Sequence, residues 1–294
     1  MNTAQIYQQI TARILTEIEK GIIPWQRPWT SSTGAISHIS GRPYSLLNQM
    51  LINIGNDNNG EAFAEGEYLT FNQAKAEGGM VRRGEKGKWI VFWTMYQKER
   101  EKEDGTKTVD SIPCLRSYYV FEVSQCDGIK RKYELSQRPV LDPVAEAEQV
   151  VNTYFDRETV KLRVCESNRA YYNPTADLVN VPQMSQYDAV AEYYSTLFHE
   201  MTHSTGHVSR LDRLEKNAFF GSEEYSKEEL VAEIGAAFLV GKVGIDSSRA
   251  FRNSVAYLQG WSRKLKEDSK LFIHAASKAE AAVNYILNGK EVEE

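Results

Sequence analysis

Two histidines four residues apart, with a glutamate directly after the first, are the most chemically informative feature of this sequence. His199, Glu200 and His203 form an H-E-x-x-H motif. In a helix, four residues span about one turn and roughly 6 Å, so both imidazoles project from one face and can reach one metal ion. The motif predicts a catalytic divalent metal, Zn²⁺ by default, with Mn²⁺ or another divalent ion as alternatives. Glu200 is then the predicted general base of a hydrolase.

The third metal ligand must come from another part of the chain. A metzincin would place its third histidine three residues after Gly206, but His207 follows Gly206 directly. On a continuing helix His207 would lie two turns, roughly 12 Å, from His199, which is too far for shared coordination. We therefore expect His207 either at the end of the helix or hydrogen-bonded to one of the metal ligands without binding the metal itself.

A carboxylate on the next predicted helix is the better third ligand. Glu229 and Glu233 lie four residues apart on one helix face, and two histidines with one glutamate form the gluzincin-like site of many zinc peptidases. We assign Glu229 to the metal and Glu233 to the spare ring N–H of a liganding histidine. Ser226-x-x-Glu229 also matches a capping box, which is an ordinary helix start. In that case Glu233 would be the ligand.

Helices and a small sheet must position these residues. Apolar residues recur with helical spacing through 189–203 and 226–240, and Asp142 and Pro143 are a favourable start for a helix over 144–155. Residues 160–167 and 170–182 are rich in strand formers. The second stretch resembles the edge strand beside the motif helix in zinc peptidases, which could bind an extended peptide. An ordinary strand pair with a turn at Pro174 is the alternative.

The first part of the chain has a different character. Thr3 is predicted to cap a first helix that stops at Gly21. An irregular segment with Trp25 and Trp29 follows, and then a short helix capped by Thr70. The strand over 88–96 is apolar on both faces, so we expect it to be central or covered. A charged, turn-rich stretch then predicts an exposed hairpin tip before a strand over 116–123.

Composition and charge divide the chain into two parts. The 294 residues are 41% apolar and 26% charged, which excludes disordered and collagen-like chains. Up to residue 135 there are 17 Lys and Arg against 16 Asp and Glu, and beyond it 18 against 24. We predict an α+β protein with a mixed α/β domain over 1–130, a linker over 131–143 and a mostly helical domain with a small sheet over 144–294.

The sequence also indicates where the protein works. No segment has the roughly 18 consecutive apolar residues of a membrane helix, and the N-terminus lacks the apolar core of a signal peptide. Three cysteines in no C-x-x-C spacing support neither a disulfide framework nor a cysteine zinc site. We therefore expect a cytoplasmic protein with reduced thiols and no membrane partner.

Several sequence blocks in the same order resemble the ArdC-type antirestriction proteins of conjugative plasmids. The blocks are PWQRPW, GRPYSLLNQMLI, YLTFNQAKAEGGMVRRGEKG, HEMTHSTGHVSRLDR and EYSKEELVAEIGAAFL, and the resemblance covers nearly the whole chain. It implies a zincin-like metallopeptidase domain after an N-terminal domain that binds single-stranded DNA. It also implies that the protein helps incoming plasmid DNA to escape restriction.

Cations and flat side chains are the residues that single-stranded DNA requires, since cations follow the phosphates and rings stack on the bases. The turn VRRGEKGK and the irregular segment supply both types. The candidates are Trp25, Arg27, Trp29, Arg42, Tyr44, Arg82, Arg83, Lys86 and Lys88. The charge of this half is close to neutral, so a solvated turn and core tryptophans are the ordinary alternative.

Three functional hypotheses follow from these patterns. In the first, the protein binds single-stranded DNA and carries a metal-dependent peptidase site whose protein substrate is unknown, with restriction enzymes or other DNA-bound proteins as hypothetical targets. In the second, it coats single strands and its metal site is structural or regulatory, without proteolysis. In the third, it is a peptidase whose first domain binds protein.

Overall fold

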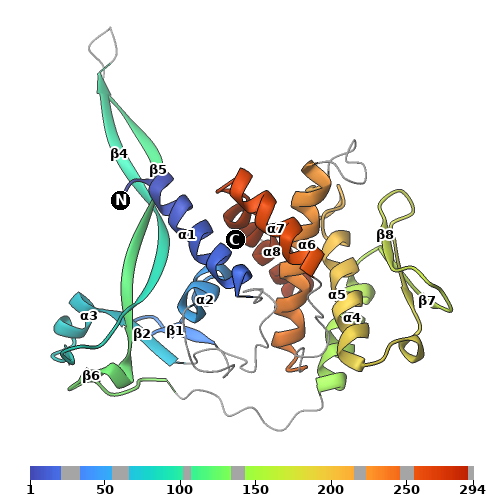
Figure 1. Cartoon of the computed structure of the whole chain (residues 1–294), viewed down its shortest axis with the longest axis horizontal. Helices are drawn as coiled ribbons and strands as arrows, with labels where there is room; N and C mark the ends of the chain where they lie inside the picture. The colour runs from blue at the N-terminus through green and yellow to red at the C-terminus, as the bar shows by residue number, and fades with distance from the viewer. Residues whose placement is uncertain are drawn as a thin grey trace.

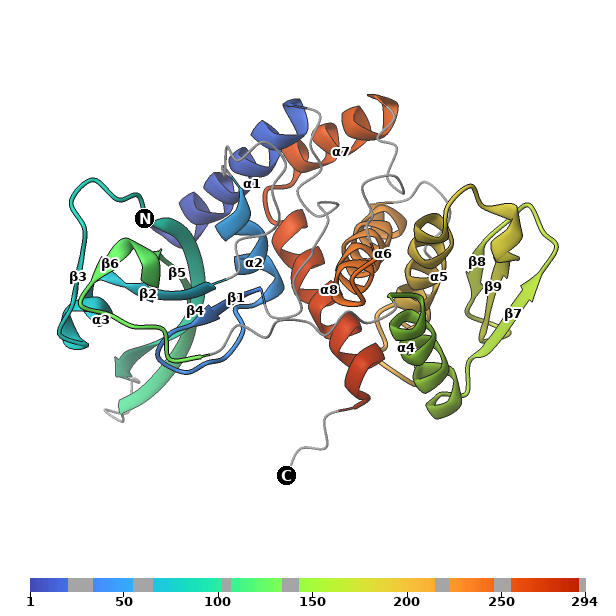
Figure 2. The same ribbon diagram turned by 90° about the horizontal axis from the view of Figure 1, so that it is seen from below.

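The chain folds into a mixed α+β structure with a sheet at each end and a layer of helices between them (Figures 1 and 2). The computed structural model describes residues 1–20, 34–54, 66–101, 107–133, 143–214, 223–245 and 255–290. This architecture confirms the predicted fold class, with an N-terminal α/β region and a mostly helical C-terminal region that contains a small sheet. Among the described helices, none combines the length and apolar character needed to cross a bilayer.

The N-terminal region is built around a curled sheet of four strands in the order β1-β2-β5-β4. Strands β4 and β5 pair antiparallel along their whole length and form a hairpin that projects from the body of the molecule (Figure 1). Thr70 caps α3 with a capping box, as predicted, but the prediction that Thr3 caps the first helix is wrong, because the Asn2 side chain accepts the Gln5 backbone N–H and caps α1. The elements of this region are α1 (Thr3–Glu19), β1 (Ala35–Ser37), α2 (Leu46–Asn53), β2 (Gly66–Thr70), α3 (Phe71–Ala76), β3 (Met80–Val81), β4 (Lys88–Glu101), β5 (Lys107–Glu122), η2 (Val123–Gln125) and β6 (Cys126–Asp127).

The expectation that the strand over 88–96 is central is wrong, because β4 is an edge strand of its sheet, and the expected cover is present only at its start. Its first residues are buried on both faces, with Trp89 and Val91 packed under α1 and Ile90 on the opposite side. Further along, Phe92, Trp93, Met95 and Tyr96 are all exposed. The apolar residues of β4 are therefore buried at the base of the hairpin and exposed in its outer part.

A buried carboxylate holds the segment that leaves this sheet. Glu67 accepts the backbone N–H groups of Lys132 at 3.0 Å and of Tyr133 at 2.7 Å. The Nδ1 atom of His38 lies 2.6 Å from the same carboxylate, and both side chains of this pair are fully buried. These contacts lower the pKa of Glu67 although burial alone would raise it. The predicted linker therefore begins from a fixed point on the sheet.

The C-terminal region consists of five helices and a three-stranded sheet in the order β7-β9-β8, among the described residues. Strand β7 pairs parallel with β9, and β8 pairs antiparallel with β9, which leaves β8 at the edge beside α5. The elements are α4 (Pro143–Arg157), β7 (Lys161–Cys165), β8 (Tyr171–Asn173), β9 (Leu178–Pro182), η3 (Met184–Gln186), α5 (Val190–Ser204), α6 (Glu223–Lys242), α7 (Val255–Glu267) and α8 (Leu271–Asn288).

One hydrophobic core joins the two regions. The buried isoleucines of α1 pack with residues of α6, α7 and α8 in the same cluster that contains Trp89 and Leu115 of the N-terminal sheet. Polar contacts cross at the same place, since Glu280 of α8 accepts the backbone N–H of Leu46 at the start of α2. Thr11 of α1 donates to the carbonyl of Ser269. The two predicted domains thus share a buried interface in addition to their linker.

Candidate metal centre

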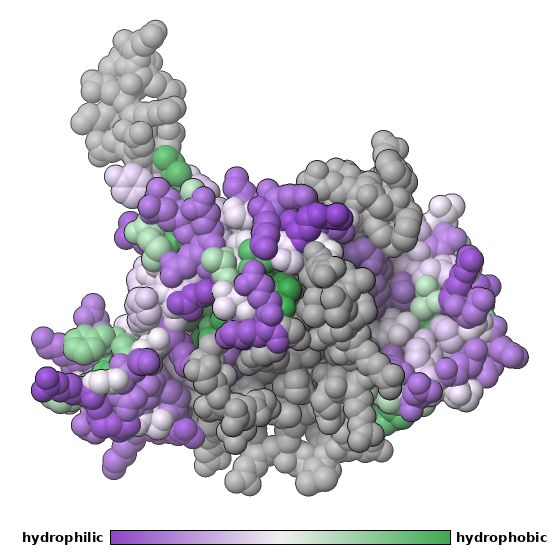
Figure 3. All heavy atoms as spheres, in the orientation of Figure 1, coloured by the Kyte–Doolittle hydropathy of each residue, from purple (hydrophilic) through white to green (hydrophobic). Residues whose placement is uncertain are grey.

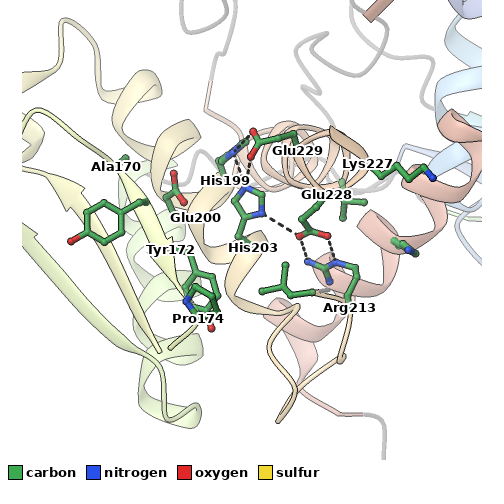
Figure 4. A pocket seen from close by; sticks show the side chains of 14 residues that line it. Ala170, Tyr172, Pro174, His199, Glu200, His203, Arg213, Lys227, Glu228 and Glu229 are labelled. Atoms are coloured by element: carbon green, nitrogen blue, oxygen red, sulfur yellow. Dashed lines mark hydrogen bonds and ion pairs between the residues drawn. The ribbon is translucent and has the colours of Figure 1, made fainter. Parts of the chain in front are cut away.

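Two imidazoles and one carboxylate converge between helices α5 and α6 (Figure 4). The Nε2 atoms of His199 and His203 lie 3.1 Å apart. The Glu229 carboxylate approaches both rings, with one oxygen 3.6 Å from Nε2 of His199 and the other 3.4 Å from Nε2 of His203. The structure thus brings together the three side chains assigned to the metal from the sequence.

These separations match the ligand spacing of a small divalent ion. A tetrahedral ion with bonds of about 2.0–2.1 Å holds its ligand atoms about 3.3–3.4 Å apart. The three distances of 3.1, 3.4 and 3.6 Å bracket this value. The donor set of two imidazole nitrogens and one carboxylate oxygen fits Zn²⁺ and also Mn²⁺. The residues present therefore fit a bound metal.

Close packing of α5 against α6 sets the distance between the histidines and Glu229. A Cβ atom on Gly235 of α6 would lie only 2.7 Å from Cγ2 and 2.8 Å from Oγ1 of Thr202. Thr202 is fully buried and lies next to His203 on α5. Glycine at position 235 therefore allows the two helices to approach closely one and a half turns beyond the ligand Glu229.

Glu228, directly before Glu229, contacts the far side of His203. Its Oε1 atom lies 3.2 Å from Nδ1 of His203. When Nδ1–H donates to this carboxylate, Nε2 carries the lone pair and faces Glu229 and His199. The sequence analysis gave the role of accepting the spare ring N–H to Glu233. It did not indicate Glu228, because neighbouring residues on a helix point about 100° apart and Glu229 was already assigned to the metal.

Arg213 holds Glu228 with a bidentate ion pair. Its Nε and Nη2 atoms donate to the two carboxylate oxygens at 2.8 and 2.9 Å, and the arginine side chain is 5% exposed. Arg213 also donates to the carbonyl of Thr202 at 2.7 Å and to the hydroxyl of Thr205 at 3.0 Å. The chain Arg213–Glu228–His203 therefore ties the end of α5 to α6, and the dashed lines in Figure 4 follow it downward from His203.

The loop after α5 folds back so that Arg213 reaches this position. The backbone N–H groups of Arg213 and Leu214 donate to the carbonyl of Gly206. A Cβ atom at Gly206 would lie 2.8 Å from Leu214 and 3.2 Å from the Arg213 guanidinium, so only glycine leaves room for this return. The loop is also anchored by buried Arg210, which forms an ion pair with Asp177 in the turn between β8 and β9.

Burial and close charges shift the ionisation of the centre. Burial alone would lower the pKa of His203, but its contacts with the Glu228 and Glu229 carboxylates raise that pKa to about 10. Burial would raise the pKa of Glu229, and its contacts with His199 and His203 instead hold it well below the ordinary value. The pKa of Glu200 is raised, because burial outweighs the attraction of the two nearby imidazoles.

A cleft of about 500 Å³ opens onto this centre. Strand β8 forms one wall, with Glu200 between that wall and the two histidines (Figure 4). The Tyr172 backbone of the edge strand acts on the Glu200 carboxylate and partly offsets the effect of burial on its pKa. The cleft is lined by Ala170, Tyr171, Tyr172, Pro174, His199, Glu200, His203, Arg213, Leu214, Lys227, Glu228, Glu229, Val231 and Lys278.

Three further expectations concern residues around the centre. Helix α5 ends at Ser204, so His207 lies in the following loop, where its Nδ1 atom is 2.8 Å from the Ser209 hydroxyl. The capping-box interpretation of Ser226 is wrong, because α6 begins at Glu223 and Ser226 lies inside the helix. Glu233 lies one turn beyond Glu229 on α6 and is not part of the cleft lining, and its predicted role stays a prediction.

The residues predicted to bind DNA are spread over the N-terminal region. Trp25, Arg27 and Trp29 lie outside the described residues. Arg42, Arg83 and Lys86 are exposed, and Lys88 begins β4. Arg82 is engaged, since it donates to the carboxylate of Glu85 and to the carbonyl of Ser124.

Tyr44, also predicted to bind DNA, packs among other rings. It contacts Tyr68 and Phe92 with ring centroids 6.5 and 6.1 Å away, and burial raises its pKa to about 12. Sequence reasoning did not select Phe92, because it assigned the apolar residues of that strand to a covered sheet.

Comparisons with known proteins match both regions of the chain. Residues 149–278 match the zincin-like metallopeptidase family, and residues 4–121 match the N-terminal domain of anti-restriction factor ArdC. The crystal structure of the antirestriction ArdC protein from plasmid R388 is similar in its metal-free form, with 35% identity and a TM-score of 0.74. Its Mn(II)-bound form gives 35% identity and a TM-score of 0.73. Each alignment covers 96% of this chain and 97% of the ArdC chain.

Similar sequences also occur within longer proteins. Two DNA primases TraC of Escherichia coli are 29% and 26% identical over 96% and 98% of this chain. The chain spans only 27% and 20% of the length of these primases. The protein y4eC of Sinorhizobium fredii (strain NBRC 101917 / NGR234) is 28% identical over 96% of this chain and 91% of its own length.

Proposed function

This chain belongs to the ArdC antirestriction proteins, and from that membership and the geometry of its cleft we propose that it is a metal-dependent peptidase that also binds single-stranded DNA. The convergence of His199, His203 and Glu229 beside Glu200 is the observation that carries this proposal. The protein would protect incoming plasmid DNA from restriction by acting on proteins that meet the DNA, a substrate class that includes restriction enzymes.

His199, His203 and Glu229 would hold the metal. A divalent ion bound there supplies Lewis acidity, which polarises a peptide carbonyl and makes water a stronger nucleophile at neutral pH. Mn(II) is the ion present in one structure of the related ArdC protein, and the donor set of this chain accepts Mn²⁺ as well as Zn²⁺.

Glu200 is the proposed proton carrier. It lies in the cleft next to the histidines and is 8% exposed, and burial raises its pKa above the ordinary value of a glutamate. In the forward reaction its carboxylate takes a proton from the attacking water and passes that proton to the departing amine. Tyr172 of strand β8 lines the cleft beside this carboxylate.

We propose that the substrate binds along the edge strand β8. It is paired only on the side of β9, within the described sheet, and it forms a wall of the cleft. An extended peptide can add to such an edge through main-chain hydrogen bonds, which bind many sequences with little dependence on side chains. This placement supports a protein substrate in preference to a small molecule.

The test of the catalytic assignment uses full-length protein with Mn²⁺ or Zn²⁺, single-stranded DNA and candidate DNA-bound proteins. We expect Glu200→Gln to slow peptide cleavage by a factor of about 100 or more, because general-base catalysis contributes roughly that much, while metal affinity is retained. Glu192→Gln, which makes the same change on the same helix away from the cleft, is the control. Cleavage by Glu200→Gln at the wild-type rate would refute the assignment.

The second candidate function is a coat for incoming single strands with a structural or regulatory metal. The intact H-E-x-x-H motif and open cleft favour catalysis over this alternative. Antirestriction activity of a Glu200→Gln variant that still binds metal and DNA discriminates between them. Full activity of that variant supports the coat, and loss of activity supports the peptidase.

A further inference from the structure

A group of partly exposed aromatic rings lies on one face of the β4–β5 hairpin, in a part of the sequence distant from the residues of the metal centre. Phe92 is 42% and Tyr118 is 39% exposed, and their ring centroids lie 6.1 Å apart. The ring centroid of Tyr44 lies 6.1 Å from that of Phe92, and Tyr96, four residues further along β4, is 52% exposed. We call these four residues the aromatic face. Figure 3 shows apolar residues at the surface of this hairpin, below its grey tip.

Strand register places an arginine among these rings. Phe92 pairs with Arg116 across β4 and β5, and Ile90 pairs with Tyr118, so all four side chains lie on the same side of the sheet. Arg116 is exposed, and so is Arg42, two residues before Tyr44. The strand segments 88–96 and 112–120 contain no acidic residue. The aromatic face therefore carries only positive charge along these segments.

The opposite side of the same hairpin, next to α1, also has exposed rings but differs in the cation beside them. Trp93 and Tyr119 are exposed there, at 53% and 55%. A described cation on that side is Arg13 of α1, which lies over the Trp89 ring at 4.8 Å and is half-buried. The exposed rings of the α1 side thus provide an internal control with the same strands and similar exposure.

We propose that the aromatic face is the surface on which the bases of single-stranded DNA stack, with Arg116 and Arg42 contacting the phosphates. This inference rests on the proposed DNA-binding function and names the residues that perform it. Exposed rings accept the flat face of any base, and arginines neutralise phosphates and stack on bases as well. A DNA duplex hides its base faces, so the arrangement selects unpaired strands.

Binding of a labelled 20-nucleotide oligothymidine to the full chain tests this placement, measured by fluorescence anisotropy at several salt concentrations. We expect Phe92→Ala and Tyr118→Ala each to weaken binding by about tenfold, the loss of one stacking contact, with little change in salt dependence. Phe92→Tyr retains a ring and is expected to keep wild-type affinity. Phe92→Leu preserves apolar volume for folding but loses affinity as the alanine variant does.

Arg116→Gln should give a different signature. Loss of one phosphate contact lowers the slope of log affinity against log salt by about 0.7 for single strands. Trp93→Ala on the α1 side is expected to bind like the wild type. Wild-type affinity of both Phe92→Ala and Tyr118→Ala, in a protein that binds oligothymidine, overturns this placement and leaves DNA binding intact.

Other outcomes separate the two proposals. A wild-type protein that does not bind the oligonucleotide refutes the DNA-binding function and the aromatic face together. Equal losses in Trp93→Ala and Phe92→Ala show that the hairpin as a whole, and not this face, supports binding. A self-association that Phe92→Ala abolishes while DNA affinity stays unchanged assigns the face to a second copy of the chain and overturns the proposal.

Discussion

The residues behind the metal centre determine how well its ligands are presented. His203 faces the metal position with Nε2 because its other nitrogen contacts Glu228, whose two carboxylate oxygens accept from Nε and Nη2 of Arg213. A ligand ring that is already oriented loses less entropy when it binds an ion. The pair Arg213–Glu228 should therefore act on metal binding although neither side chain is one of the three assigned ligands.

Metal titration of Arg213→Lys and Glu228→Gln tests this role. We expect either change to weaken Mn²⁺ or Zn²⁺ binding by about 10- to 100-fold, since lysine cannot reproduce the bidentate pair and glutamine weakens the hold on Nδ1. Isothermal titration calorimetry, with competition by a chelator where binding is tight, gives the affinities. Glu192→Gln serves as the charge-matched control on α5. Unchanged affinity in both variants would show that His203 is oriented without them.

A second charged pair, Asp177–Arg210, stabilises the sheet and loop that flank the cleft. Arg210 is almost fully buried, and Asp177 also accepts the Tyr172 hydroxyl at 2.8 Å. Burial would raise the pKa of Asp177, but these partners lower it. We expect Asp177→Asn to reduce the free energy of unfolding by about 3 kcal/mol at neutral pH, because it leaves a buried guanidinium without its counter-charge.

This stabilisation should depend on pH in a defined direction. Because the pKa of Asp177 is lower in the folded than in the unfolded chain, its contribution is complete above the unfolded value of about 3.9 and falls as pH decreases toward the folded value. Urea unfolding of wild type and Asp177→Asn at pH 7, 5 and 3.5 measures the difference. A difference that grows on acidification would contradict the assignment.

At the scale of elements, the spacing of α5 and α6 decides whether the three ligands can meet. Gly235 allows the contact with Thr202, next to His203, and every larger residue would push the helices apart. The same pair of helices carries all three assigned ligands. A change in helix packing should therefore appear both in stability and in metal affinity.

Two helix glycines give a matched test of this packing. Gly235→Ala gains helix propensity but overfills the α5–α6 contact, so we expect a net loss of about 1–2 kcal/mol in unfolding free energy and weaker metal binding. Gly260→Ala in α7 meets nothing within 4 Å and is expected to stabilise the chain by up to about 1 kcal/mol without affecting metal binding. Thermal melts and metal titrations compare them. Equal effects of the two substitutions would show that the helix contact is not tight.

At the scale of the whole molecule, the two regions behave as one structure because they share a core. Ile6, Ile10 and Ile14 of α1 are fully buried in the cluster that includes Phe272 of α8. Separating the regions would expose this apolar surface to water, at a free-energy cost of about 25 cal/mol per Å² of exposed area. A linker alone would not produce such coupling.

Cutting the chain between the regions tests the coupling. We expect segments 1–133 and 143–294 to be poorly soluble when each is expressed alone and to copurify when both are expressed together, since each buries the apolar face of the other. The intact chain should unfold in a single cooperative transition, measured by circular dichroism and calorimetry. Two well-separated transitions, or two stable separate halves, would contradict a shared core.

The local chemistry of the centre could be predicted from sequence because its signals are short-range. Helical spacing places His199, Glu200 and His203 on one turn, and the apolar period around Glu229 identifies the helix that carries it. Mixed α+β architecture followed from the same kind of local pattern, as did the strand pair with a turn at Pro174, which β8 and β9 form. Each of these inferences depends on neighbours within a few residues in the chain.

Only the tertiary structure decided what lies behind and beyond those residues. Glu228 and Arg213 meet His203 through a loop that returns under Gly206, and no spacing in the sequence encodes that return. The order of strands places β4 at the edge of its sheet, so aromatic rings that the sequence pattern assigned to the core form an exposed face. Helix α1 packs across the predicted domain boundary against α7 and α8. Such contacts join residues far apart in the chain, where burial and close packing, rather than local periodicity, select the partners.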